Sequence, residues 1–484
     1  MKMKTILAAA LVGALAFATT GAQAEDINTR IGKLSFENGI PSKESMTKLY
    51  DEMDFQRAVQ AYIWATPAVH FNEWPVQMKR QLGLGYGDVA IWDNYCDPKT
   101  IGLTPNDTTI YASTHIDTGV GPVVIESPPG ALGMIDDIWQ RPIADVGPFG
   151  PDKGKGGKFL ILPPDYKGEV PKEGYFVLRS TSRVSGYLVR GLVQAGNVKA
   201  AVDNLRGIHI YPWSQRANPP KTKFVSVSGV PVNLLAPVGF EYWERVAEIV
   251  NREPVDERDR FIHAQLRFLG IEKGQPFQPD ARQKALLTEA AVVGHAMNQT
   301  ISFGSRLPGS EYLKGSKWEI LFSLNPDQRT AHYDQIDERA NYTYQGIWVA
   351  NGMVLQMVGK GSQYLGASQD KAGNWLVGDH AYTLHMPANV PAKDFWSVTV
   401  YDSLTRSMVV TDTLKPSVGS NLPLDVNADG SVDLYFSPTA PAGKEKNWVK
   451  TSPGKAWFAL FRAYGPLKPF FNRSWVLPDI EQVK

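Results

Sequence analysis

The stretch TPNDTTIYASTHID (Thr104–Asp117) has the alternating pattern of a β-strand with two different faces. Side chains along a strand point in turn to opposite faces of a sheet. From Thr108 onward, one face carries Thr108, Ile110, Ala112, Thr114 and Ile116, and the other carries Thr109, Tyr111, Ser113, His115 and Asp117. The second face holds hydroxyl, imidazole and carboxyl groups but no Lys, Arg or Glu. Three explanations are open: the face is solvated, it lines a ligand site, or it is enclosed by an internal hydrogen-bond network.

A catalytic triad is not the explanation of this row, although Ser113, His115 and Asp117 follow one another on it. Same-face neighbours on a strand lie about 6.6 Å apart at the backbone. A nucleophile and its base need a hydrogen bond of about 2.6–3.2 Å. We expect the row instead to be partly enclosed, with Asn106, Asp107, Tyr111 and His115 contributing to a ligand site.

A second stretch with the same design is FWSVTVY (Phe395–Tyr401). Trp396, Val398 and Val400 share one face and are expected in a core, and the other face carries Phe395, Ser397, Thr399 and Tyr401. The segments YTLH and FRAYGP add Tyr382, His385, Arg462 and Tyr464. A solvated sheet face would explain these residues. The alternative is a polar pocket flanked by aromatic rings, in which a tyrosine donates a proton and the arginine binds a carboxylate or phosphate.

Composition describes an ordinary globular protein of several domains. The chain has 484 residues, and a domain typically takes about 150. Hydrophobic residues make up 43% and charged residues 20%, and the net charge of +1 lacks the basic excess that nucleic-acid binding requires. The 43 Gly and 34 Pro favour many turns and a mainly β fold with helical additions.

The first 24 residues have the features of a secretory signal peptide. A basic start, MKMK, precedes an apolar run that ends in Ala22-Gln23-Ala24. We expect a mature chain from Glu25 in the periplasm or outside the cell. No other apolar stretch reaches spanning length, so stable membrane insertion is not expected. Cys96 is the one cysteine, which leaves no internal disulfide and predicts an isolated thiol.

The order of elements follows from periodicity and breakers. Residues 25–50 are polar and predict a mobile lead-in. Helical spacing begins in YDEMDFQRAVQAYIWATP, Pro67 is expected to stop that helix, and a second helix is expected to end at Gly83. Short strands fill 100–215, helices fill about 237–303, 305–370 is mixed, and strands return from about 374. Pro279 and Asp280 are placed to open the last of the middle helices.

Several standard motifs fail. No G-x-S-x-G elbow is present, and the loop GPFGPDKGKGGKF lacks the phosphate-loop spacing. The eight histidines are scattered, so neither a metal site nor a cofactor is predicted. Asp425–Asp433 resembles the start of a calcium loop, but its twelfth position is Phe436. Asp429-Gly430 between PLDV and SVDLYF predicts a hairpin without calcium.

The chain also resembles a known family. LTPNDTTIYASTHIDTGVGPVVIESP is similar to the DUF1254 domain of bacterial proteins of unknown function. NYTYQGIWVANGM, YTLHMPANVPAKDFWSVTVYD, NADGSVDLYFSP, NWVKTSPGKAWFALFRAYGP and SWVLPDIE are similar to the DUF1214 domain that follows it. The acidic, Gly-rich MIDDIWQRPIADVGPFGPDKGKGGKF departs from the family pattern, so a common substrate does not follow.

The resemblance implies two β-sandwich, jelly-roll-like domains with a helical middle segment, and a homo-oligomer. The expected boundaries are 25–235 for the first domain, 236–370 for the connecting region and 371–484 for the second domain. Two functions stay open: an exported enzyme that acts on a small polar or aromatic molecule by acid–base chemistry, or a module that binds a saccharide or other ligand without turnover. The candidate ligand-binding residues are Asn106, Asp107, Tyr111, His115, Tyr382, His385, Ser397, Thr399, Tyr401 and Arg462.

Overall fold

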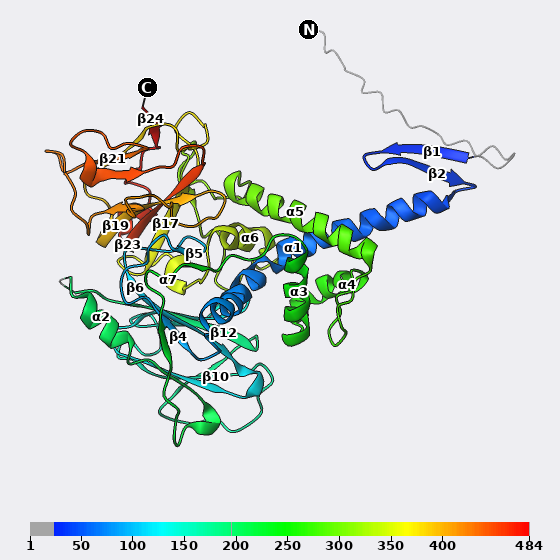
Figure 1. Ribbon diagram of the computed structural model, residues 1–484, viewed down its shortest axis with the longest axis horizontal. Helices are drawn as coiled ribbons and strands as arrows, with labels where there is room; N and C mark the ends of the chain where they lie inside the picture. The colour runs from blue at the N-terminus through cyan, green and yellow to red at the C-terminus, as the bar shows by residue number, and fades with distance from the viewer. Residues whose placement is uncertain (1–23, 195, 484) are drawn as a thin grey trace, which may run out of the picture. The chain divides into compact units, whose positions relative to one another are not determined.

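The computed structural model describes residues 24–194 and 196–483, and it is mainly β with helices around residues 43–82 and 240–303. The predicted signal peptide lies outside the described residues except for Ala24. The described chain divides into two compact units, residues 24–56 and residues 57–483, and each is treated by itself. Figure 1 labels the elements of both units.

The first unit is ordered into strands, so the prediction of a mobile lead-in over residues 25–50 is wrong. Strands β1 (Ala24–Thr29), β2 (Gly32–Glu37) and β3 (Ile40–Pro41) form an antiparallel sheet. The turn between β2 and β3 is Asn38-Gly39, and both residues have positive φ, at 53° and 79°. Such a pair matches the twist of a tight hairpin, which allows a polar segment to fold locally. Helix α1 (Lys43–Leu82) begins directly after this sheet.

Helix α1 continues through Pro67 and Pro75, so the prediction that Pro67 stops it is also wrong. A proline inside a helix removes one backbone donor and disturbs the carbonyls of the preceding turn. Side chains from other elements bond the two carbonyls on either side of that of Ile63, the carbonyl that Pro67 leaves without its N–H partner. Tyr242 donates its hydroxyl to the Tyr62 carbonyl at 2.8 Å, and Arg339 donates to the Trp64 carbonyl at 2.8 Å. The predicted end of the helical region at Gly83 is confirmed, because α1 ends at Leu82 and Gly83 has a φ of 68°.

The first group of sheets is a β-sandwich. Its larger sheet has the order β14 (Phe224–Ser226), β4 (Val89–Ile91), β6 (Ile110–Asp117), β12 (Val184–Gly191), β8 (Leu132–Asp137) and β9 (Pro142–Val146). Its smaller sheet has the order β11 (Phe176–Arg179), β10 (Gly157–Leu162), β7 (Val123–Ser127) and β13 (His209–Pro212). One apolar core takes Ile110, Ala112 and Ile116 from the larger sheet and Ile125, Phe159 and Ile161 from the smaller one. Helix α2 (Val198–Leu205) and the pair β5 (Thr100–Ile101) and β15 (Val232–Asn233) complete this region.

The second group of sheets is also a sandwich, which confirms the predicted fold class. One sheet has the order β16 (Glu319–Ile320), β17 (Ser362–Ala367), β23 (Trp457–Pro466), β19 (Ala392–Asp402) and β20 (Ser417–Gly419). The other has the order β22 (Trp448–Lys450), β21 (Val432–Ser437), β18 (Tyr382–Met386) and β24 (Glu481–Gln482). Trp396, Val398 and Val400 enter the core between them, as the alternation predicts. The short helix α8 (Lys468–Phe471) follows β23.

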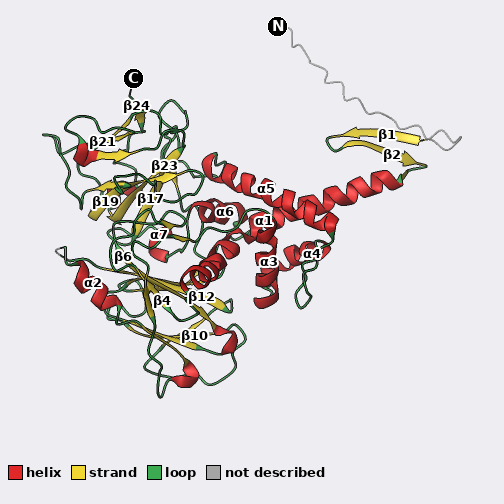
Figure 2. Cartoon of the chain, in the orientation of Figure 1, coloured by secondary structure: helices red, strands yellow, loops and turns green. Residues whose placement is uncertain are grey.

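The middle helices are α3 (Phe240–Arg252), α4 (Arg260–Phe268), α5 (Ala281–Phe303), α6 (Ile336–Gln345) and α7 (Asn351–Val354). Figure 2 shows them in red beside the yellow strands of both sandwiches. Asp280 caps α5 in a reciprocal arrangement with Gln283, which confirms the predicted start of that helix. Helix α7 contacts β9 and β17, so it touches both sandwiches. Within the described residues, no helix combines the length and apolar character needed to cross a bilayer.

The loop at Asp425–Asp433 is a turn, but it is not the predicted hairpin between two strands. Gly430 has a φ of 83° and donates its N–H to the Asn427 carbonyl, which closes the turn. The preceding PLDV segment forms no strand. The side chain of Asn447 bonds both the N–H and the carbonyl of Asp425, so these groups are not free for a ladder.

Candidate functional site

A cavity lies between the outer faces of the two larger sheets, the faces that point away from the sandwich cores. It contains about 850 Å³ of space free of protein atoms, part of it open to solvent. Tyr111 of β6 and Leu188 and Arg190 of β12 line one side. Tyr364 of β17 and Leu460 and Arg462 of β23 line the other. The polar face on β6 therefore contributes Tyr111 to one side of the cavity. Arg462, on the strand that pairs with β19, contributes to the other side.

The cavity wall is mainly apolar and aromatic. The apolar side chains that line it include Trp74, Trp92, Trp348, Phe322, Leu103, Leu321, Met134, Met353 and Ile347. Ligand sites in proteins combine such walls with a few placed polar groups. The lining of this cavity fits a small organic molecule.

An amide joins two phenols at one end of the cavity. Asn106 accepts the backbone N–H of Thr108 at 3.1 Å, which holds its side chain across the turn before β6. Its Nδ2 donates to the Tyr464 hydroxyl at 2.7 Å and to the Tyr111 hydroxyl at 3.2 Å. Burial raises the pKa of Tyr464 to about 12. This phenol therefore keeps its proton at neutral pH and acts as a hydrogen-bonding group.

Arg462 is buried and bonds oxygens of both sandwiches, as the sequence predicts for an arginine beside Tyr401. It donates to Thr399 Oγ1 at 3.1 Å, to the Tyr401 hydroxyl at 2.8 Å and to the Thr104 carbonyl at 3.2 Å. Burial acts to lower its pKa, but the surrounding tyrosines more than offset this and leave the pKa above the ordinary value. Arg462 is therefore a permanent cation in the cavity wall.

The segment Thr104–Asp107 is held in place by the second sandwich. Tyr401 donates its hydroxyl to the Pro105 carbonyl at 2.6 Å, and Ser417 donates to the Asp107 carboxylate at 2.6 Å. Burial raises the pKa of Asp107, and its Oδ1 is buried without a hydrogen-bond partner. Asp107 does not itself line the cavity, but it lies beside Pro105 and Asn106, which do.

Trp348 is held in the cavity wall by the turn between β8 and β9. Its φ is 71°, a left-handed conformation that a bulky residue adopts only under outside constraint. Gln140 Oε1 accepts its N–H at 3.0 Å, and the Tyr342 hydroxyl donates to its carbonyl at 2.5 Å. Asp136 accepts the next N–H, that of Val349, at 2.8 Å.

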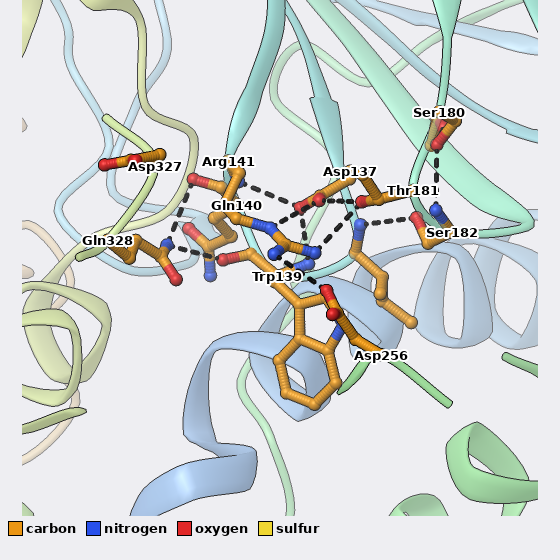
Figure 3. A network of polar contacts seen from close by, with 12 residues as sticks. Asp137, Trp139, Gln140, Arg141, Ser180, Thr181, Ser182, Asp256, Asp327 and Gln328 are labelled. Carbon is orange, nitrogen blue, oxygen red and sulfur yellow. Dashed lines mark hydrogen bonds and ion pairs between the residues drawn. The ribbon is translucent and has the colours of Figure 1, made fainter. Parts of the chain in front are cut away.

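A polar network holds the turn between β8 and β9 in position (Figure 3). Asp137 accepts the backbone N–H groups of Trp139 and Arg141 at 2.9 Å each, and Arg141 Nε at 2.7 Å. Asp256 and Thr181 bond the remaining nitrogens of the Arg141 guanidinium, and Gln328 donates to the Trp139 carbonyl at 2.8 Å. The network therefore supports the wall from behind and takes no place in the cavity.

The structure answers how the row on β6 is covered. Ser113 is 3% exposed and His115 is 6% exposed, so the predicted enclosure is confirmed. His115 packs against Phe71 and Trp348, with ring centroids at 4.9 and 5.2 Å. Burial lowers the pKa of His115 to about 3, which keeps the ring neutral. Tyr111 reaches the cavity, whereas His115 lies behind Trp348.

The remaining candidate ligand-binding residues fall into two groups, those at the cavity and those away from it. Asn106, Tyr111 and Arg462 line the cavity, and Thr399 and Tyr401 bond to Arg462. Ser397 is fully buried opposite Arg462 in the β19–β23 ladder. Tyr382 and His385 belong to β18, in the sheet on the far side of the core, and the structure does not bring them to the cavity. His385 bonds Asp433 at the surface.

Sequence reasoning missed Arg190 and the tryptophans of the wall. Arg190 interrupts the apolar run SGYLVRGLV, and an arginine inside a buried strand is a sign that was available. No local pattern marks Trp74, Trp92 or Trp348 as neighbours, because they come from α1 and from two separate loops. Cys96 also lines the cavity, and burial raises its pKa to about 12, so it is present as a thiol. The described residues contain no cluster of three or more potential metal ligands from His, Cys, Asp and Glu.

Fold and cavity together define a protein of two β-sandwiches whose outer sheet faces share one cavity with an apolar and aromatic wall. Comparison with known families places DUF1254, a domain of unknown function, at residues 86–212, and DUF1214, also of unknown function, at residues 361–468. The chain is thus a two-domain protein that carries both of these domains. Tyr111 and Arg190 lie in the first domain, and Tyr364 and Arg462 lie in the second.

One solved structure supports the fold. The crystal structure of the VPA0106 protein from Vibrio parahaemolyticus is similar, with a TM-score of 0.57 and 19% identity over 89% of this chain and 100% of that chain. A structure of an uncharacterised protein from Burkholderia cenocepacia has a TM-score of 0.40 and 13% identity over 91% of this chain and 97% of that chain. No curated protein matches the sequence.

Proposed function

We propose that this protein binds a small organic molecule with an apolar, flat body in the cavity between its DUF1254 and DUF1214 domains. The observation that carries the proposal is that both domains contribute side chains to one aromatic wall with few polar groups. Binding is favoured over acid–base turnover because Cys96, which lines the cavity, and Tyr464, which bonds the cavity residue Asn106, hold their protons at neutral pH. They are suited to donate hydrogen bonds and not to abstract protons.

A fluorescent apolar amine, N-phenyl-1-naphthylamine, provides a direct test on the purified protein. Its emission rises when it leaves water for an apolar site, and we expect saturable binding. Leu188→Trp fills the cavity and should weaken that binding by about tenfold or more. Val177→Trp adds the same ring to β11, where the side chain is exposed, and should leave binding unchanged.

Thermal unfolding and circular dichroism of both variants separate loss of binding from loss of fold. The proposal fails if Leu188→Trp keeps the fold and the melting temperature of the wild type and still binds the probe equally well. It also fails if the wild-type protein does not bind the probe.

Acid–base turnover at the same place is the second function, and one observation favours it. Asp107 has a raised pKa and an unpartnered buried oxygen next to the cavity residue Asn106. A buried carboxyl with a raised pKa is a candidate proton donor or acceptor. Incubation with a bacterial metabolite extract, followed by mass spectrometry, tests it: the wild type should deplete a compound that Asp107→Asn leaves intact. Equal depletion by both proteins would remove Asp107 from the chemistry.

Export and self-association complete the proposal. The basic and apolar start of the chain, with Ala22-Gln23-Ala24, supports secretion to the periplasm or beyond. N-terminal sequencing of the exported protein should find Glu25 first. The expectation of a homo-oligomer comes from the family resemblance, and light scattering on the purified protein tests it.

A further inference from the structure

Arg190 occupies an unusual place for a cation. It lies within β12, an interior strand, opposite Tyr111 of β6 and Leu132 of β8. Its side chain is half-buried and lines the cavity. The guanidinium carbon lies 5.9 Å from the ring centroids of both Tyr111 and Tyr464. Aromatic faces hold a cation in position, but they do not neutralise its charge.

No carboxylate within the described ranges forms an ion pair with Arg190. The groups that act on its charge are the phenols of Tyr111, Tyr364 and Tyr464. Burial acts to lower the pKa of Arg190, yet these phenols leave it above the ordinary value, so the charge persists at any physiological pH. A cation that is removed from bulk water and left without a counter-ion is costly to fold.

Three other arginines of low exposure are paired with carboxylates. Arg141, Arg245 and Arg258 have side chains 13%, 12% and 6% exposed. Each contacts a carboxylate, of Asp137, Glu73 and Asp334 respectively. Arg462, the second arginine of the cavity, already donates to three protein oxygens and has Asp107 in its wider surroundings. Of the two cavity arginines, Arg190 therefore has donors left for a ligand, beyond its side-chain hydrogen bond with Tyr364.

We propose that the ligand of this cavity is an organic monoanion, whose carboxylate bonds to Arg190 and whose ring-bearing body packs against Trp74, Trp92 and Trp348. The proposal rests on the proposed function and names the chemical class that the site accepts. A planar carboxylate matches the fork of a guanidinium with two parallel hydrogen bonds. One guanidinium balances the single charge of a carboxylate, whereas a phosphate dianion would keep an uncompensated negative charge in the cavity, which is costly.

The test compares the binding of an organic acid with that of its uncharged amide analogue. The compounds 2-naphthoate and 2-naphthamide share size and ring system, and each is titrated against bound N-phenyl-1-naphthylamine. We expect naphthoate to displace the probe at concentrations about tenfold or more below those needed for naphthamide. Naphthyl phosphate, the dianion, should compete less well than naphthoate.

Substitution of the arginine assigns the preference to its residue. Arg190→Met should remove the advantage of the acid while the neutral probe still binds. Arg216→Met is the matched control, because Arg216 is an exposed arginine over the Trp213 ring in the same domain and should leave the preference unchanged.

The outcomes separate the two proposals. Equal displacement by the acid and the amide, with probe binding intact, would overturn the anion assignment and leave the cavity as a site for neutral molecules. A preference for the acid that survives in Arg190→Met would also overturn it. Absence of probe binding to the wild type would overturn the proposed function itself, and the anion assignment with it.

Discussion

Arg141 and Arg190 belong to the same sheet region of the first sandwich, yet their surroundings are opposite. Arg141 is enclosed by Asp137, Asp256 and Thr181, in a network where its donors meet protein oxygens (Figure 3). Arg190 meets three phenols and an empty volume. A completed network stabilises a turn, whereas an incomplete one keeps bonding capacity for another molecule. The comparison shows that the candidate binding site is marked by the missing carboxylate partner of Arg190, and not by the presence of an arginine as such.

The largest expected effect is at the completed network. Asp137→Ala leaves Arg141 without its closest carboxylate and leaves the N–H groups of Trp139 and Arg141 without an acceptor. We expect a loss of about 3–5 kcal/mol in the free energy of unfolding, measured by urea denaturation. Asp203→Ala breaks the exposed pair with Lys199 and should cost about 0.5 kcal/mol or less. A similar small cost at both positions would contradict a structural role for the network.

A middle effect is expected at the amide–phenol cluster. Tyr464→Phe removes the hydroxyl that accepts from Asn106 at 2.7 Å. We expect a loss of about 1 kcal/mol, because one buried amide donor then lacks its shorter bond. Tyr435→Phe on β21 is the control, since the cation of Lys444 over that ring does not need the hydroxyl. Equal melting temperatures for the two variants would show that the cluster does not contribute.

Arg190→Met should change stability less than Asp137→Ala, and in the opposite direction. The substitution removes a half-buried cation that has no carboxylate partner, so stability should stay level or rise by up to about 1 kcal/mol. Ligand binding should fall at the same time, as described above. If Arg190→Met instead unfolds the protein as Asp137→Ala is expected to, Arg190 is a structural residue and the contrast with Arg141 disappears.

The last effect concerns pH and Asp136, which accepts from Val349 but has one oxygen without a partner. Burial raises the pKa of this carboxyl well above its ordinary value. Because the folded pKa lies above the unfolded one, stability should fall as pH rises from the unfolded value through the folded value. Asp136→Asn keeps an acceptor for Val349 and cannot ionise. Its melting temperature should match the wild type near pH 4 and exceed it at pH 8, and parallel profiles would contradict this assignment.

The alternation of side chains predicted much of this architecture. Trp396, Val398 and Val400 enter a core as expected, and Asp280 caps α5 where the sequence places it. Period and capping are local properties, so a single sequence carries them. Pro67 shows the limit: α1 continues through it, and the nearby Trp64 carbonyl accepts from Arg339, which lies 275 residues away in the chain.

The candidate site was predictable in its parts and not in its assembly. Tyr111, Asn106 and Arg462 are marked by polar groups in an apolar pattern. The pattern does not say which sheet covers which, so Tyr382 and His385 appeared as plausible as Tyr401. Arg190 reaches Tyr464 across 274 positions of chain, a pairing that no spacing rule encodes. Contacts of this kind arise when two separately folded faces meet.

The clasp at Thr104–Asp107 has a consequence for how such a chain can change over generations. A loop of the first domain is held by side chains of the second, Tyr401, Ser417 and Arg462. Each domain alone would expose its part of the apolar cavity wall to water. Replacing either domain by an unrelated one would require a new set of residues in that wall. We therefore expect the two domains to evolve together, and if the gene were split between residues 212 and 361, the two products would have to associate to form the cavity.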